Sequence, residues 1–225
     1  MKKQVLEVQH INAFVTERKK HLLRKKARRQ ILYDVSFCID EGEIFGLMGP
    51  SGVGKSTLAR VILGLHKDVD GTVVHHSEKP QMVFQDPYGS LNPRMTVAAM
   101  LEEALFIADA GKKEQHRKKI TEMLMLVGLD EALLTRRPQK LSGGQRQRVS
   151  IALALIGGAK FIVLDEPVSA LDATHKRQIL TLLKDLQQNL GLSYLLISHQ
   201  QKTVEYMCKR VLMLKEDGSW EIQKI

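Results

Sequence analysis

The sequence predicts an α/β fold that combines a parallel sheet, an antiparallel β subdomain and an inserted α-helical subdomain. Short apolar runs at residues 44–48 and 161–164 are typical of buried parallel strands. Alternating polar and apolar residues within 1–40 indicate the antiparallel sheet, and amphipathic periods indicate the helices. The 225 residues suit a single domain spanning 1–225, with the helical piece inserted at about 96–157.

The remaining elements follow from the same patterns. We expect strands at residues 5–8, 31–39 and 194–197, helices at 98–108 and 113–127, and a C-terminal hairpin over 211–222 that turns at Asp217-Gly218. The two cysteines, Cys38 and Cys208, lie in apolar segments without metal-ligand spacing. We therefore expect both to be reduced thiols of the core.

A phosphate-binding loop follows the first apolar run. Residues 49–56 match the pattern G-x-x-x-x-G-K-[ST] at every position, and an amphipathic stretch, 58–65, comes after them. Glycines leave backbone N–H groups free to surround phosphate oxygens, and the helix that begins near Lys55 adds its positive end. We therefore expect the core of a P-loop NTPase, in which Lys55 bridges the β- and γ-phosphates of ATP, Ser56 binds Mg²⁺ and Thr57 reaches the α-phosphate. The nucleotide-binding residues expected in this loop are Gly49, Pro50, Ser51, Gly52, Val53, Gly54, Lys55, Ser56 and Thr57.

Two carboxylates follow the second apolar run. Ligands bind at the carboxyl ends of parallel strands, so Asp165 is placed to hold Mg²⁺ through its water shell. Glu166, one residue further, is placed to orient or deprotonate the attacking water. A surface turn with two solvated acids is the alternative, but four uninterrupted apolar residues would rarely precede one.

The segment at 141–148, Leu-Ser-Gly-Gly-Gln-Arg-Gln-Arg, resembles the LSGGQ signature of the ATP-binding cassette family. The resemblance continues with Ser-Ala-Leu-Asp at 169–172 and Ser-His at 198–199, so that five motifs in the family's order cover residues 49–199. Ser142 caps a helix whose N-terminus, with small residues beside it, forms a second anion site. The resemblance implies that this site faces the γ-phosphate held by another subunit, that ATP joins two cassettes head to tail, and that His199 contacts the γ-phosphate. The residues expected to do so from the signature are Ser142, Gly143, Gly144 and Gln145.

The segment at 84–97, which reads FQDPYGSLNPRMTV, is similar to the ATPases of peptide and nickel importers. Gln85 resembles the family's residue that completes the Mg²⁺ and water site, and the loop after it would contact a transmembrane partner. The resemblance implies ATP hydrolysis coupled to import of peptides, nickel or metal–chelator complexes. It implies permease subunits, a second cassette (identical or a paralogue) and an extracytoplasmic solute-binding protein as partners.

Two other functions remain open. The motor of an exporter or a lipid-extracting complex would share all five motifs, and only the sequence from Tyr88 to Met95 argues against it. A soluble cassette acting on nucleic acid would be expected to carry zinc-binding cysteines, a long coiled-coil insertion or two cassettes in one chain, and the sequence shows none of these. The family also places an aromatic residue under the adenine, about four residues after Ile11. Val15 occupies that position here, so Phe14, one residue earlier, is the candidate for adenine stacking.

Charge is concentrated in one segment. Residues 18–29 hold eight Lys or Arg and no acid, and subtracting these from the net charge of +9 leaves +1 for the rest. The segment has no aromatic residue to stack on bases, so we expect a solvated loop, or attraction to anionic lipid, and no nucleic-acid partner. No apolar run reaches the ~18 residues that span a bilayer, and no signal-peptide pattern opens the chain. We therefore expect a peripheral protein on the cytoplasmic face of the membrane.

Overall fold

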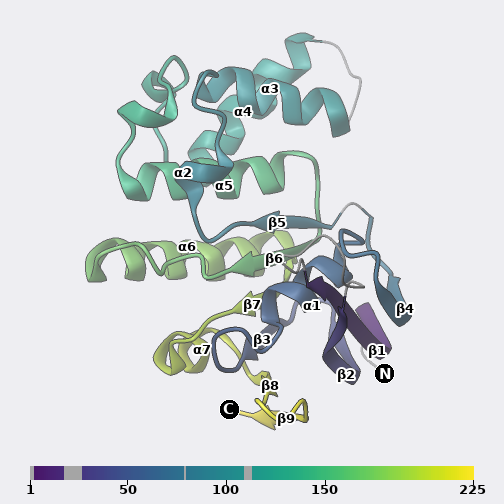
Figure 1. The fold of residues 1–225 in the computed structure, drawn as a ribbon. Coiled ribbons are helices and arrows are strands. Elements are labelled where there is room, and N and C mark those ends of the chain that lie inside the picture. The colour runs from purple at the N-terminus through teal and green to yellow at the C-terminus, as the bar shows by residue number, and fades with distance from the viewer. Residues whose placement is uncertain (1–2, 18–26, 79, 109–112) are drawn as a thin grey trace. The chain divides into compact units, whose positions relative to one another are not determined.

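A computed structural model describes residues 3–17, 27–78, 80–108 and 113–225 (Figure 1). The chain divides into two compact units, one formed by Met1–Ser77 with Leu195–Ile225 and the other by Glu78–Tyr194. The basic segment of the sequence falls mostly on residues 18–26, outside the described residues, so its expected loop is not tested. Within the described ranges, no helix has both the length and the apolar character needed to cross a membrane.

The first unit contains the expected antiparallel sheet. Its strand order is β2-β1-β4, with β1 at Gln4–Glu17, β2 at Ala27–Asp40 and β4 at Val69–His75. The pairing of β1 with β2 shifts register between Val8 and Ile11, where His10 (φ 53°) and Asp34 (φ 50°) adopt left-handed conformations. His10 Nδ1 and Asp34 Oδ1 lie 2.7 Å apart across this irregularity. Both strands are therefore longer, and more irregular, than simple alternation predicts.

The first unit also contains β3 (Ile44–Met48), which pairs in parallel with β8 (Arg210–Leu214). β8 pairs antiparallel with β9 (Trp220–Lys224), which confirms the C-terminal hairpin. Trp220 Nε1 donates a hydrogen bond to the carbonyl of Asp34, so the hairpin is tied to β2. The helices of this unit are α1 (Lys55–Ile62) and α7 (Gln201–Met207).

The second unit is mainly helical. Its strands β5 (Gln81–Val83) and β6 (Phe161–Asp165) are parallel, and the four apolar residues of β6 are buried as predicted. The boundary between the two units falls within β7 (Ser193–Ile197). The strands of the mixed sheet therefore follow the order β5-β6-β7 in this unit and β7-β3-β8-β9 in the first. The helices are α2 (Pro87–Ser90), α3 (Val97–Ala108), α4 (Lys113–Leu126), α5 (Gly143–Ile156) and α6 (Ala173–Leu190), with 3₁₀ turns η1 (Glu131–Leu133) and η2 (Pro138–Lys140).

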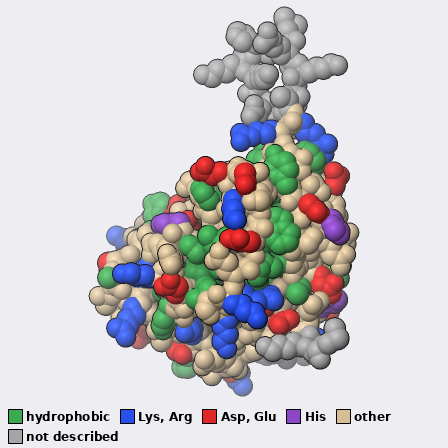
Figure 2. All heavy atoms as spheres, turned by 90° about the horizontal axis from the view of Figure 1, so that it is seen from below, with side chains coloured by type: hydrophobic (Ala, Val, Ile, Leu, Met, Phe, Trp, Pro, Cys, Tyr) green, Lys and Arg blue, Asp and Glu red, His purple; other side chains and the backbone are tan. Residues whose placement is uncertain are grey.

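Each unit has an apolar core that agrees with the sequence pattern. Leu6, Ile39 and Phe45 are fully buried in the first, and Leu101 and Phe161 in the second. Lys and Arg side chains are interspersed with Asp and Glu on the face shown in Figure 2. Neither cysteine forms a disulfide with a described residue; Cys208 is buried in the core as expected, whereas Cys38 is only half-buried.

Candidate functional site

The phosphate loop connects β3 to α1 and depends on glycine. Gly49 (φ 148°), Gly52 (φ 81°) and Gly54 (φ 114°) all have positive φ, which side-chain-bearing residues rarely adopt. A Cβ atom at Gly49 would lie 2.5 Å from the carbonyl oxygen of Leu214, and one at Gly54 would lie 2.8 Å from Cγ2 of Ile31. The loop therefore has the bare backbone that a phosphate cradle requires.

Lys55 crosses this loop. Its ammonium donates hydrogen bonds to the carbonyl oxygens of Gly49 and Pro50, each at 2.7 Å. α1 begins at Lys55 with no acidic residue in its first turn, so the positive end of the helix and the ammonium lie at the same place. A cavity of about 320 Å³ opens beside the loop, lined by Ser51, Gly52 and Val53 together with parts of β2 and the turn after β8. These features fit a bound polyphosphate.

The second unit brings three predicted residues together. Gln85 Nε2 donates a hydrogen bond to Glu166 Oε2 over 3.2 Å. Asp165 ends β6, and with Gln85 it lines a cavity of about 390 Å³. The amide nitrogen of Gln85 faces a carboxylate, so its oxygen is the atom that a metal ion would use. The sequence motifs therefore meet in space within this unit.

Glu166 has an unusual backbone. Its φ of 47° lies in the left-handed region, which is energetically unfavourable for a residue that has a side chain. The surrounding structure must therefore stabilise this conformation. Its carbonyl accepts hydrogen bonds from the Ser169 backbone N–H at 3.2 Å and the Ser169 hydroxyl at 3.1 Å, which closes the turn. Glu166 therefore lies in a closed turn directly after β6, next to Asp165 at the end of that strand.

The oxygen donors expected for Mg²⁺ are the Ser56 hydroxyl, the Gln85 amide and the Asp165 carboxylate. These are hard ligands of the kind Mg²⁺ prefers, and Mg²⁺ normally completes its shell with water and substrate phosphates. Within the described part of the chain, no cluster of three or more His, Cys, Asp or Glu could hold a metal by itself. The chemistry of each donor suits Mg²⁺, and its binding by these three residues together stays a prediction.

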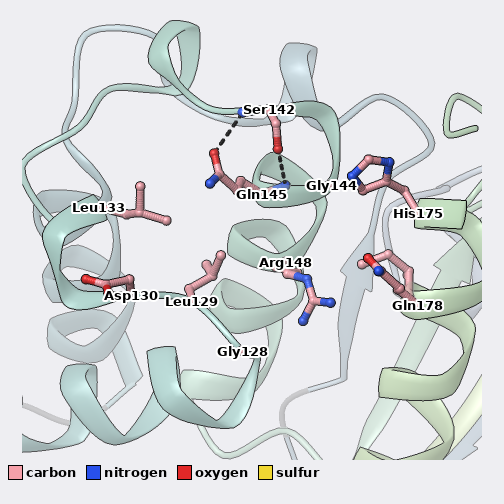
Figure 3. A pocket seen from close by; sticks show the side chains of 11 residues that line it. Gly128, Leu129, Asp130, Leu133, Ser142, Gly144, Gln145, Arg148, His175 and Gln178 are labelled. Carbon is pink, nitrogen blue, oxygen red and sulfur yellow. Dashed lines mark hydrogen bonds between the residues drawn. The ribbon is translucent and has the colours of Figure 1, made fainter.

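The signature segment starts α5. Ser142 Oγ accepts a hydrogen bond from the Gln145 backbone N–H at 3.2 Å, and Gln145 Oε1 accepts one from the Ser142 backbone N–H at 2.9 Å. This reciprocal capping box, shown in Figure 3, fixes the first turn of a helix that has no acidic residue there. A Cβ at Gly143 would make an ordinary 3.5 Å contact with Leu171, so the second unit has room for a β-carbon at that position. Gly144 is buried, and a side chain there would meet His175.

A cavity of about 390 Å³ lies beside this turn (Figure 3). It is lined by the capping pair Ser142 and Gln145, by Arg148 further along α5, and by His175 and Gln178 of α6. Arg148 donates a hydrogen bond to the carbonyl of Val127, which ties α5 to the end of α4. The anchored turn and these polar side chains surround a space at the N-terminus of α5, where the sequence predicts an anion site.

The other predicted residues lie in the first unit. His199 lies two residues after the end of β7. The residue between them, Ser198, donates a backbone hydrogen bond to the carbonyl of Leu47 in β3, at 3.3 Å. His199 is therefore next to the strand that leads into the phosphate loop. Phe14 lies in β1, and the Arg28 guanidinium stacks on its ring at 3.6 Å from the centroid. Arg28 is held there by Asp68, with hydrogen bonds of 2.6 and 3.0 Å, which raise its pKa.

Sequence reasoning missed two contacts. Arg28 was grouped with the basic segment, but the structure places it in β2, paired with Asp68 and stacked on Phe14. His175 belongs to none of the sequence motifs, yet its ring lies against Gly144. In the sequence, Arg28 and His175 stand in no pattern that indicates a partner. Neither contact could therefore be predicted without the fold.

Comparison with known proteins agrees with this geometry. The family model described as "ABC transporter" matches residues 32–169. The chain is 40% identical, over 94% of its length and 72% of the relative's, to the oligopeptide transport ATP-binding protein OppF of Bacillus subtilis. It is 39% identical to the dipeptide transport ATP-binding protein DppF of Escherichia coli, covering 87% of this chain and 63% of that one, so it spans about two thirds of these relatives.

Solved structures show the same fold. The ATP-binding cassette MJ0796, in a dimeric post-hydrolysis state with ADP and Pi, is 29% identical with a TM-score of 0.82, over 97% of this chain and 98% of that one. CbiO1 of Clostridium perfringens, part of the transporter complex cbiONQ, is 26% identical with a TM-score of 0.81, over 99% of this chain and 88% of that one. The chain therefore belongs to the ABC transporter family of ATP-hydrolysing cassettes.

Proposed function

We propose that this chain is the ATP-hydrolysing subunit of a peptide importer. The observation that carries the proposal is the 40% identity to OppF over 94% of the chain, which includes the segment 84–97 that resembles peptide and nickel importers. The names of OppF and DppF support peptides as the cargo class. Nickel and metal–chelator complexes remain cargo candidates from the wording of the same segment.

The residues of the chain divide the work of hydrolysis. The phosphate loop binds and orients the nucleotide, with Lys55 compensating charge on the transferred phosphoryl group and Thr57 reaching the α-phosphate. Ser56, Gln85 and Asp165 would hold Mg²⁺, which supplies positive charge to the phosphates when bound. Glu166 accepts the proton of the attacking water, or orients that water, and its hydrogen bond to Gln85 places the carboxylate.

The signature segment completes the site of a second cassette. In this proposal Ser142, Gly143, Gly144 and Gln145 face the γ-phosphate of the partner, and His199 contacts the γ-phosphate of its own site. The capped turn of α5 and the room at Gly143 support this arrangement. Phe14 stacks on the adenine with the face opposite to Arg28.

The chain works with other subunits in this proposal. Permease subunits carry the cargo across the membrane, the cassette docks to them on the cytoplasmic face, and an extracytoplasmic protein binds the cargo first. The second cassette is an identical chain or a paralogue. Conformational change driven by ATP is passed to the permease through the loop after Gln85.

Uptake by a deletion strain tests the proposal. Loss of this gene should abolish uptake of labelled di- or oligopeptides, and a gene with Glu166→Gln should not restore it. Nickel uptake measured in the same strains separates the two cargo classes. Normal uptake of both, together with a defect in DNA repair or translation, would contradict the importer assignment in favour of the nucleic-acid alternative. A defect in efflux or lipid extraction would favour the exporter alternative.

A further inference from the structure

His175 links two motifs that are separate in the sequence. It lies in the first turn of α6, directly after the Ser-Ala-Leu-Asp segment at 169–172, and its ring is directed at the start of α5 (Figure 3). A Cβ built on Gly144 would lie 2.9 Å from Cδ2 of His175, and the next two nearest atoms, at 3.6 and 3.7 Å, belong to the same ring. The imidazole therefore packs on the bare backbone of the signature turn.

The orientation of this ring is fixed by Asp172. One carboxylate oxygen of Asp172 accepts from the backbone N–H groups of Thr174 and His175, at 3.1 and 3.0 Å, and so caps α6. The other lies 2.6 Å from Nδ1 of His175. The backbone and ring N–H groups of His175 lower the pKa of Asp172, so the carboxylate is ionised at neutral pH and Nδ1 carries the proton. The Asp172 carboxylate therefore both caps α6 and holds the ring of His175.

The same segment begins at the turn of Glu166. The Glu166 carbonyl accepts from the backbone and hydroxyl of Ser169, and Leu171 lies where a side chain at Gly143 would meet it. One short stretch of chain therefore joins the Glu166 turn to Asp172 and His175, and it meets the first turn of α5 at Leu171 and at the His175 ring. None of these contacts involves a residue of the phosphate loop.

We infer that His175 is a positioning residue for the shared site: its ring, clamped by Asp172, holds the signature turn in a fixed relation to the Glu166 turn of the same chain. This rests on the proposed function, in which the signature turn contacts the partner's nucleotide. It predicts that His175 affects the association of two cassettes and the turnover that follows, and leaves binding of ATP to the phosphate loop of one cassette unchanged.

The test uses the full chain with Glu166→Gln, so that ATP is bound and not consumed. His175→Ala should weaken ATP-dependent association roughly tenfold, below the ~100-fold that a full ångström of misplacement can cost. Thr174→Ala is the matched control, because this exposed neighbour contributes only its backbone N–H to Asp172. His175→Asn keeps a donor for Asp172 but loses the ring, and should recover part of the loss. Affinity for ATP in a monomer should be the same in all four proteins.

A second pair of variants isolates the ring contact. Gly144→Ala should weaken association more in the presence of His175 than in a His175→Ala background, because the three atoms nearest to the added Cβ all belong to that ring. Equal losses in both backgrounds, or a His175→Ala protein that associates like the parent, would overturn the inference.

Hydrogen exchange separates this inference from the proposed function. The amides of Ser142–Gln145 should exchange faster in His175→Ala than in the parent, while the strands of the sheet keep their protection. If the parent fails to associate with ATP alongside every candidate partner, the shared-site function is wrong, and hydrogen exchange alone decides the role of His175. Unchanged exchange in the signature turn would then overturn it.

Discussion

Gln85 Nε2 and Glu166 Oε2 are hydrogen-bonded over 3.2 Å, although the two residues are 81 positions apart in the sequence. The bond joins the amide that we expect to bind Mg²⁺ to the carboxylate that we expect to orient the attacking water. Because Glu166 also has a φ of 47°, its side chain is set both by the turn and by this partner. The carboxylate of Glu166 is therefore placed before any nucleotide arrives, as electrostatic and acid–base catalysis require.

Glu166→Gln is expected to reduce ATP hydrolysis by about 10²–10⁴-fold, the usual contribution of a general base, while ATP binding survives. The trapped protein should associate stably with ATP and Mg²⁺, with itself or with a paralogous cassette. Size-exclusion chromatography with light scattering, in ATP and in ADP, measures this. Glu102→Gln, an exposed carboxylate on α3, is the control and should behave like the parent.

Adding Gly143→Leu to the Glu166→Gln protein should prevent that association. The monomer has room near Leu171, so folding should be preserved, as circular dichroism would show. Loss of association in a protein that keeps its fold would indicate that Gly143 faces another subunit. Identical masses in ATP and ADP for the Glu166→Gln protein, with every plausible partner present, would indicate a phosphate-loop ATPase that works alone.

Lys55→Ala is expected to abolish hydrolysis and strongly weaken nucleotide binding. Lys55 is placed by two carbonyls of the loop, and its removal leaves the charge of the transferred phosphate uncompensated. Fluorescent-nucleotide titration and phosphate release measure the two effects. Lys209→Ala, at an exposed position, should leave both unchanged; equal turnover in Lys55→Ala and the parent would contradict the assignment.

Mutations in the two parts of the basic segment should have different effects on ATP hydrolysis. Neutralising Arg24, Lys25 and Lys26 is expected to leave basal ATPase intact, because they lie outside every catalytic motif. Arg28→Ala should raise KM for ATP about threefold with little change in kcat, since the guanidinium supports the ring of Phe14. Asp68→Asn should shift KM in the same direction, because it loosens Arg28. A KM unaffected by either change would remove Phe14 from the adenine site.

Asp172 should contribute to stability in a pH-dependent way. Its pKa is lowered in the folded state, mainly by the backbone N–H of His175, so its contribution is fully present above the ordinary carboxyl value and is lost as the pH falls through the lowered one. The Tm of Asp172→Ala should lie below that of the parent at pH 7, and the difference should shrink in acid. A difference that stays constant from pH 7 to acid would show that the cap does not depend on the charge.

The sequence alone determined the local parts of this protein. The phosphate loop, the acidic strand end and the capped signature helix are contiguous, and each depends on rules that act over a few residues: glycine at positive φ, a buried apolar run, and a serine with a glutamine three residues later. The family and the outline of the fold followed from their order. Strand and helix positions were predicted to within a few residues, except where β1 and β2 extend further.

The tertiary structure decided what these parts touch. Arg28 reaches Phe14 because the long pairing of β1 with β2 sets them side by side, and Asp68, 40 residues away, holds the guanidinium. His175 reaches Gly144 only because α6 and α5 pack together. Such contacts depend on strand register and helix packing, which sum many weak interactions between distant segments, so no local pattern records them.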